Sequence, residues 1–320
     1  MANKLSISRV IIGVSIVSLI LQIVASLYLI PKLNQPVEWF YVGLAIAFEF
    51  AAFAVLAPFT KVFYATQKAW FSYPKSLTLL LSSEAFSRLV PFGDFFVHRY
   101  YFNRHDLPKG APLRYITVLY SFALLSLITL FLAFQVAVFI LYPSQISSSF
   151  AGKFVLIPLT ITLAILALFA LRRSPRLTRN IQKFSRKQLG SEVDSPFQIL
   201  RDSKKSTGSI LLMLLPLIAT WILEGFAYVA CLTAFGVDAP LLLGMYAYTF
   251  VKMFRFIPIF PGGVGEIEAT SLLLFSAYGY AALPVITGSI LFRFVSYWFP
   301  IAMGAISAQL ILKRRMTFKT

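Results

Sequence analysis

Charged side chains interrupt an otherwise apolar sequence at two similar places, and both could bind an anion. The first reads Arg88-Leu-Val-Pro91 and is followed by Gly93 and Asp94. The second reads Arg255-Phe-Ile-Pro258 and is followed by three glycines and Glu266. Arginine binds phosphate through a planar, permanently charged fork, and a helix that restarts after a break offers free N–H groups at its positive end. The repeated pattern therefore predicts two halves of one phosphate site.

Other ionisable side chains in the apolar segments are candidates for the same site, because a charge at membrane depth must face protein, water or a partner. The residues expected to bind substrate are Arg88, Asp94, Arg99, Lys252, Arg255, Gly262, Gly263, Gly265, Glu266, Glu268 and Arg293. Three further acids are candidates for proton coupling, namely Glu49, Glu84 and Glu224.

A structural role for these charges remains an alternative. Glu84 and Arg88 are one helical turn apart, with the acid first, which favours pairing. Lys252 or Arg255 could likewise neutralise Glu266 or Glu268, and a lone acid can simply hydrogen-bond within a helical bundle. The stretch 255–269 could also be a loop at the membrane surface. Its likeness to the first motif favours instead a broken turn at membrane depth that lines a cavity.

The sequence predicts no metal site, no cofactor and no nucleic-acid partner. His98 and His105 lack a third ligand nearby and are expected to be surface residues at the membrane edge. The only cysteine, Cys231, excludes an internal disulfide. The 29 Lys and Arg residues against 12 Asp and Glu give a net charge of +17. In a membrane protein this excess indicates positively charged cytoplasmic loops and contact with anionic headgroups.

The elements that position these residues are membrane helices. The chain is 58% hydrophobic and 13% charged, which predicts an all-α polytopic integral membrane bundle. The continuous apolar runs exclude a β-barrel. We expect a single transmembrane domain over 1–320, with a first half over about 1–171, a basic cytoplasmic loop over 172–206 and a second half over about 207–320. The run 10–30 is interpreted as a spanning helix rather than a cleaved signal.

About seven full spans are expected, together with two broken hairpins over about 77–104 and 241–280. A span over 208–235 is expected to be interrupted at Pro216. Counting the expected spans in order along the chain places both termini in the cytoplasm. The same count predicts that the two hairpins open to opposite sides of the membrane. This is the arrangement of an inverted repeat, in which the substrate site lies where broken helices meet near the midplane.

The two break motifs resemble the lysylphosphatidylglycerol synthase transmembrane (flippase-like) family. The resemblance rests on the residues 261–269 and 88–94 with Arg99 downstream, and it covers most of the chain in segment order. It implies a membrane domain that moves a phospholipid or a polyprenyl-type glycolipid between leaflets. The first motif departs from the fuller family pattern, which has an Asn and a further Gly-Gly around its break. The chain ends at Thr320 without an acyltransferase-like domain, so synthesis of aminoacylated lipid is not expected.

The function expected from the sequence is therefore a non-enzymatic flippase or transporter in the cell membrane. Its substrate would be an anionic phospholipid or a polyprenyl-linked lipid, and a separate lipid-modifying enzyme is a possible partner. Two other classes remain open. One is a non-catalytic membrane partner of such an enzyme. The other is a membrane-embedded glycosyltransferase acting on a lipid phosphate, for which the polar loops offer only isolated acids.

Overall fold

The described part of the chain is all α-helical. The computed structural model describes residues 20, 24, 36–66, 69–89, 93–103, 111–142, 207–255 and 265–313, and these residues contain no strand. Apart from residues 20 and 24, the predicted first span 10–30 lies outside them, as does the basic loop 172–206. The all-α prediction is confirmed.

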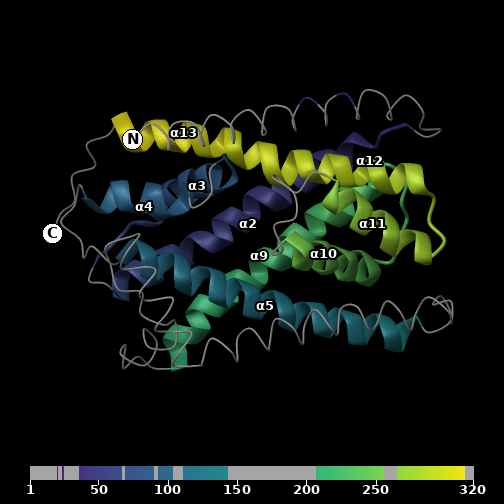
Figure 1. Ribbon diagram of the computed structural model, residues 1–320, viewed down its shortest axis with the longest axis horizontal. Helices are drawn as coiled ribbons and strands as arrows, with labels where there is room; N and C mark the ends of the chain where they lie inside the picture. The colour runs from purple at the N-terminus through teal and green to yellow at the C-terminus, as the bar shows by residue number, and fades with distance from the viewer. Residues whose placement is uncertain are drawn as a thin grey trace, which may run out of the picture.

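Four of the described helices are long and apolar enough to cross a membrane, namely Trp39–Ala65, Ala111–Leu141, Leu212–Thr233 and Ala282–Gln309. They belong to α2 (Trp39–Thr66), α5 (Ala111–Leu141), α9 (Thr207–Thr233) and a continuous run of α12 (Ala282–Arg293), η4 (Phe294–Trp298) and α13 (Phe299–Lys313). In Figure 1, α5 and the α12–α13 run lie along opposite sides of the molecule, with α2 and α9 crossing between them. The total of about seven spans stays a prediction.

One predicted interruption is wrong. Pro216 lies inside α9, and the helix continues through it to Thr233. Proline is tolerated in membrane helices because neighbouring groups can satisfy the backbone that it frees.

Two pairs of shorter helices form where the sequence predicted breaks. The first pair is α3 (Tyr73–Leu89) and α4 (Gly93–Asn103), and the second is α10 (Leu241–Arg255) and α11 (Glu266–Ala277). Both breaks therefore fall at the two repeated motifs. Figure 1 shows α3 and α4 toward one end of the molecule and α10 and α11 toward the other. Their opposite orientation in a membrane stays a prediction.

Each pair of short helices packs into its own hydrophobic cluster. Phe59, Tyr64, Leu80 and Tyr115 belong to the cluster around α3 and α4, which also takes side chains from α2 and α5. Tyr228, Phe250 and Phe275 belong to the cluster around α10 and α11. Trp221 of α9 packs against both clusters. The indole therefore lies at the boundary between the two halves of the described structure.

The first break is tight at Gly93. A Cβ atom placed on Gly93 would lie 2.0 Å from the carbonyl oxygen of Phe86 and 2.2 Å from its carbonyl carbon. Helix α4 therefore begins directly against the backbone of the last turns of α3. Only glycine permits this approach, because backbone atoms cannot move aside as a flexible side chain can.

We expect Gly93→Ala to destabilise the protein by about 1–3 kcal/mol or more, the usual cost of forcing an atom into a packed site. Thermal unfolding in detergent measures this effect. Gly43→Ala is the matched control, because a Cβ atom there has nothing within 4 Å. A Gly93→Ala protein as stable as Gly43→Ala would show that α3 and α4 are not in contact at this point.

Candidate functional site

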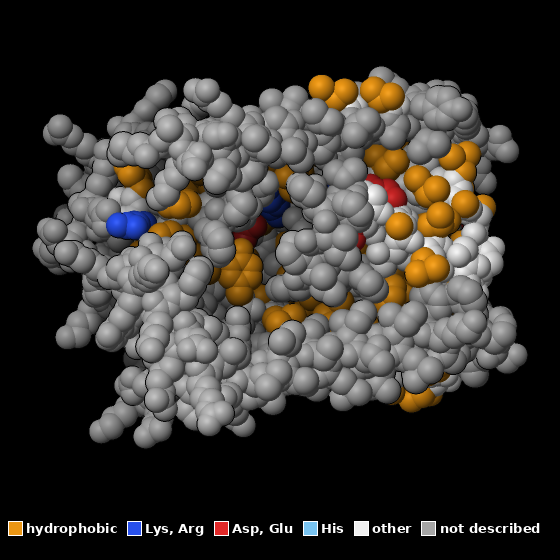
Figure 2. Space-filling model, in the orientation of Figure 1, with side chains coloured by type: hydrophobic (Ala, Val, Ile, Leu, Met, Phe, Trp, Pro, Cys, Tyr) orange, Lys and Arg blue, Asp and Glu red, His pale blue; other side chains and the backbone are white. Residues whose placement is uncertain are grey.

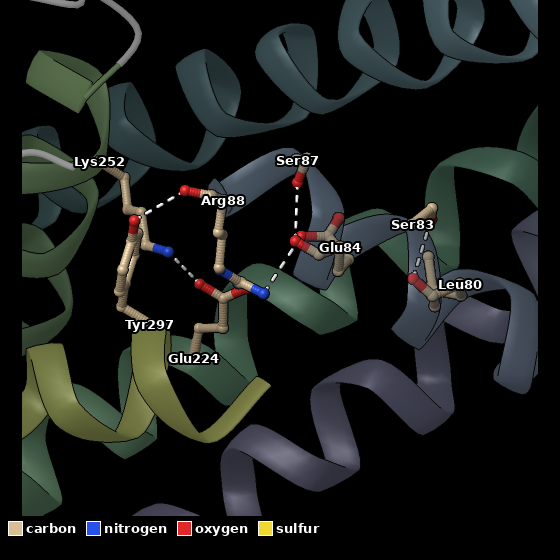
Figure 3. Close-up of polar contacts among 8 residues, drawn as sticks. All are labelled: Leu80, Ser83, Glu84, Ser87, Arg88, Glu224, Lys252 and Tyr297. Carbon is tan, nitrogen blue, oxygen red and sulfur yellow. Dashed lines mark hydrogen bonds and ion pairs between the residues drawn. The ribbon is translucent and has the colours of Figure 1, made fainter. Parts of the chain in front are cut away.

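The ends of α3 and α10 meet beside the middle of α9 and form a buried cluster of charges (Figure 3). Lys252 of α10 forms a salt bridge with Oε2 of Glu224 in α9. The Tyr248 hydroxyl donates a hydrogen bond of 2.8 Å to the same oxygen. Arg88 of α3 also interacts electrostatically with Glu224. The structure thus brings together one cation from each of the two broken helices.

Arg88 is short of hydrogen-bond acceptors. Its side chain is 8% exposed, and its Nη1 atom lies 3.4 Å from Oε2 of Glu84 in an ion pair. Within the described residues, the buried Nε and Nη1 atoms have no hydrogen-bond partner. Its Cζ atom lies 5.6 Å from the centre of the Phe53 ring. Because a buried donor without an acceptor costs about 1–3 kcal/mol, this guanidinium is suited to receive an anionic oxygen.

Three aromatic rings surround the ammonium group of Lys252. The Nζ atom lies 5.6 Å from the ring centre of Trp221, 5.4 Å from that of Tyr248 and 5.8 Å from that of Phe292. These rings come from α9, α10 and α12, and we call them the aromatic cage. Ring faces attract cations, so the cage and Glu224 together hold a positive charge in the interior.

A second buried pair joins α11 to the α12–α13 run. Arg293, which is 1% exposed, donates a hydrogen bond of 2.7 Å from Nη2 to Oε2 of Glu268. The π-helical turn η4 begins directly after Arg293, and such turns often occur at functional sites. Within it, the Tyr297 hydroxyl donates a hydrogen bond of 2.7 Å to the carbonyl oxygen of Arg88. One short segment therefore contacts both broken hairpins.

We expect Tyr297→Phe to lower stability by about 1 kcal/mol, the usual net value of one hydrogen bond. The ring stays in place, so the change removes only the bond to the last turn of α3. Thermal unfolding tests this, with Tyr73→Phe as a control, since the Tyr73 hydroxyl also donates to a carbonyl, that of Ala54, but is exposed. A larger loss in the Tyr73 variant would contradict the structural importance of the Tyr297 bond.

The charged cluster lies at the depth expected for the membrane centre. Glu224 is near the middle of the span Leu212–Thr233, and Arg293 is near the middle of the span Ala282–Gln309. Figure 2 shows acidic and basic side-chain atoms recessed near the centre of one face, next to hydrophobic side chains. Charges at such depth are costly and usually functional.

The ion pairs differ in part from those that the sequence suggested. The Glu84–Arg88 pair is confirmed. Lys252 forms a salt bridge with Glu224, and Glu268 forms one with Arg293; the sequence suggested neither of these partners. The correct partners come from different helices, so their spacing along the chain carries no pairing signal.

The remaining predicted site residues lie in α2, α4 and α10, in or directly before α11, or outside the described residues. Glu49 is fully buried in α2, and Glu266 lies in the first turn of α11. Gly265 precedes that turn with φ of 80°, a left-handed conformation that favours glycine. Arg99 is exposed, with its Cζ atom 5.9 Å from the Phe95 ring centre. Arg255 ends α10, but its side chain, Gly262 and Gly263 lie outside the described residues.

Two groups in α4 have a low-dielectric environment. Asp94 is 6% exposed, and burial together with the nearby negative charge of Glu84 raises the pKa of its carboxyl. The expectation that His98 is a surface residue is wrong, because its side chain is fully buried. Its Nδ1 atom lies 2.5 Å from the Tyr64 hydroxyl, and burial lowers the pKa of the ring to about 3. His105 lies outside the described residues.

Sequence reasoning missed the uncharged residues of the site, chiefly Trp221, Tyr248 and Tyr297. Aromatic residues are common in apolar helices, so their presence alone indicates nothing. One local signal was available: Tyr248 stands four residues before Lys252, and Trp221 three before Glu224, which places each pair on one helix face. In the described residues, no group of three His, Cys, Asp or Glu side chains could hold a metal.

The fold and this cluster define a helical membrane protein with a charged centre built around broken helices. The family profile described as "Lysylphosphatidylglycerol synthase TM region" matches residues 9–304, so the chain belongs to this family. It is also 30% identical over 84 residues to a "UPF0104 membrane protein" of Methanothermobacter thermautotrophicus. That match covers 26% of this chain and only 25% of the relative. No solved structure matches the chain significantly.

Proposed function

We propose that this protein moves a lipid whose headgroup contains an anionic phosphate between the leaflets of the cell membrane. The observation that carries the proposal is the buried Arg88 guanidinium, short of acceptors among the described residues, beside Lys252 near the middle of the spans. A phosphate oxygen would satisfy the N–H groups of Arg88. The family's name refers to a lipid, which supports a lipid as the substrate.

The carboxylates would act as exchangeable counterions. Arg88, Lys252 and Arg293 form ion pairs with Glu84, Glu224 and Glu268, respectively. These pairs keep the cluster neutral when no lipid is bound. A phosphate that enters would replace a carboxylate as the partner of a cation, and the displaced carboxylate could then take up a proton. Glu49 and Asp94 are buried in the same helical structure and are further candidates for proton coupling.

The two broken hairpins would open the site to opposite leaflets in turn. If α3–α4 and α10–α11 enter from opposite sides, as the sequence predicts, their meeting at Glu224 corresponds to the central site of an inverted-repeat transporter. Both termini would then be cytoplasmic. The basic loop 172–206 would gather anionic lipid at the cytoplasmic face by electrostatic attraction.

The test is reconstitution of the purified protein in liposomes that contain acyl-labelled phospholipids. Movement of label between leaflets is measured by a membrane-impermeant quencher and compared with protein-free liposomes. Faster movement in the presence of protein is expected. Movement no faster than in protein-free liposomes would refute transport and favour a role as a partner of a lipid-modifying enzyme. Arg255→Ala tests in the same assay whether the second break motif, which begins at Arg255, contributes to lipid movement.

A further inference from the structure

The aromatic cage has the composition of a binding site for an organic ammonium ion. Three ring faces and one carboxylate surround the Nζ atom of Lys252. Sites of this kind recognise ammonium ligands through the negative ring faces. In this protein the ammonium group belongs to the chain itself. Lys252 therefore occupies the place that a cationic ligand group would take.

The walls of the cage are held by contacts that do not involve Lys252. The Trp221 indole N–H donates a hydrogen bond of 3.0 Å to the Ser126 hydroxyl of α5. The Phe292 ring packs edge-on against Tyr228, with 5.0 Å between ring centres. Tyr228 in turn donates a hydrogen bond of 2.7 Å to Ser271 of α11. The cage would therefore keep its shape if the lysine moved out.

The close approach of two helices fixes the third wall. A Cβ atom on Gly225 would lie 2.7 Å from the Met245 sulfur and 3.2 Å from a Tyr248 ring carbon. The glycine next to Glu224 thus allows α10 to pack close to α9. The Tyr248 ring and the Glu224 carboxylate are held together by this packing and by their own hydrogen bond of 2.8 Å.

The charges of the cluster distinguish between two kinds of phosphate-bearing headgroup. Among the described residues, Arg88, Lys252 and Arg293 form ion pairs with Glu84, Glu224 and Glu268. When Lys252 turns from Glu224 to a phosphate, the buried Glu224 loses its salt-bridge partner, which is strongly unfavourable. A headgroup that carries its own ammonium would replace Lys252 beside Glu224. A headgroup that carries only the phosphate would leave a negative charge in the membrane interior that only the uptake of a proton by Glu224 could neutralise.

Resting on the proposed function, we propose that the preferred lipid carries one primary ammonium beside its phosphate, so that its headgroup is neutral overall. Arg88 and Lys252 bind the phosphate. Glu224 and the aromatic cage bind the ammonium. When the site is empty, the ammonium group of Lys252 occupies the position of the lipid's ammonium group. When the site is filled, Lys252 binds the phosphate of the lipid.

The first test compares three labelled lipids in the liposome assay: phosphatidylethanolamine, its N-acetylated derivative and phosphatidylglycerol. Acetylation replaces the ammonium by an uncharged amide and leaves the phosphate and the acyl chains unchanged, so this derivative is the matched control. We expect phosphatidylethanolamine to move at least tenfold faster than the other two. Equal rates for all three would overturn this inference and leave the proposed function intact. Movement of none of them would refute the proposed function itself.

The second test does not depend on transport. Lys252→Met removes the ammonium group from the cage, and ethylammonium chloride should then raise the thermal unfolding temperature of this variant more than sodium chloride does. The wild-type protein, with its cage filled, should show no such difference. The double variant Lys252→Met/Trp221→Leu should lose the stabilisation. An equal response of Lys252→Met to both salts would show that the cage does not bind an ammonium ion.

Discussion

Replacing Glu224 by leucine should lower the stability of the protein by about 3–5 kcal/mol, the usual cost of leaving one partner of a buried ion pair alone. Lys252 is 6% exposed, so little water can reach its ammonium group after the substitution. The hydrogen bond from Tyr248 is lost as well. Thermal and denaturant-induced unfolding in detergent, followed by far-UV circular dichroism, would measure this loss.

A second variant separates the charge from the packing. Glu224→Leu/Lys252→Met replaces the pair by apolar side chains, an exchange that is often neutral or stabilising for a buried pair. It should recover most of the lost stability but no transport, because both proposed ligands are gone. Glu38→Ala, at an exposed acid, is the control and should change little. If the double variant is less stable than Glu224→Leu alone, the two side chains do not form a pair in the interior.

Replacing Arg88 by alanine should slow lipid movement roughly 10- to 100-fold, since a hydrogen bond to a charged group contributes about 1.5–3 kcal/mol. The buried Nε and Nη1 atoms, which have no hydrogen-bond partner among the described residues, are the donors that the phosphate would use. The Glu84 side chain is 27% exposed, so water can solvate its carboxylate when Arg88 is removed. The variant is therefore expected to fold.

Arg88→Lys tests whether the planar fork is needed as well as the charge. Lysine keeps the positive charge but cannot donate two parallel hydrogen bonds to one phosphate, so we expect an intermediate rate. Lys61→Ala removes an exposed cation of α2 and should leave the rate unchanged. Wild-type rates in both Arg88 variants would remove this residue from the lipid path.

The sequence by itself determined the class of protein and the positions of the breaks. Hydrophobic composition requires membrane helices, because only they satisfy the whole backbone within long apolar runs. The breaks after Arg88 and Arg255 were predictable because proline and glycine act locally on the backbone. The Glu84–Arg88 pair was predictable for the same reason, since both residues lie one turn apart on one helix.

Only the tertiary structure decided which charges meet. Glu224 and Lys252 are 28 residues apart, and Tyr297 and Arg88 are 209 residues apart. Glu268 could have paired with any of several cations, yet α11 faces α12, so it contacts Arg293. The aromatic cage likewise needs three helices. Hydrophobic periodicity indicates which residues are buried, but in a chain that is apolar on nearly every face it does not indicate which faces pack together.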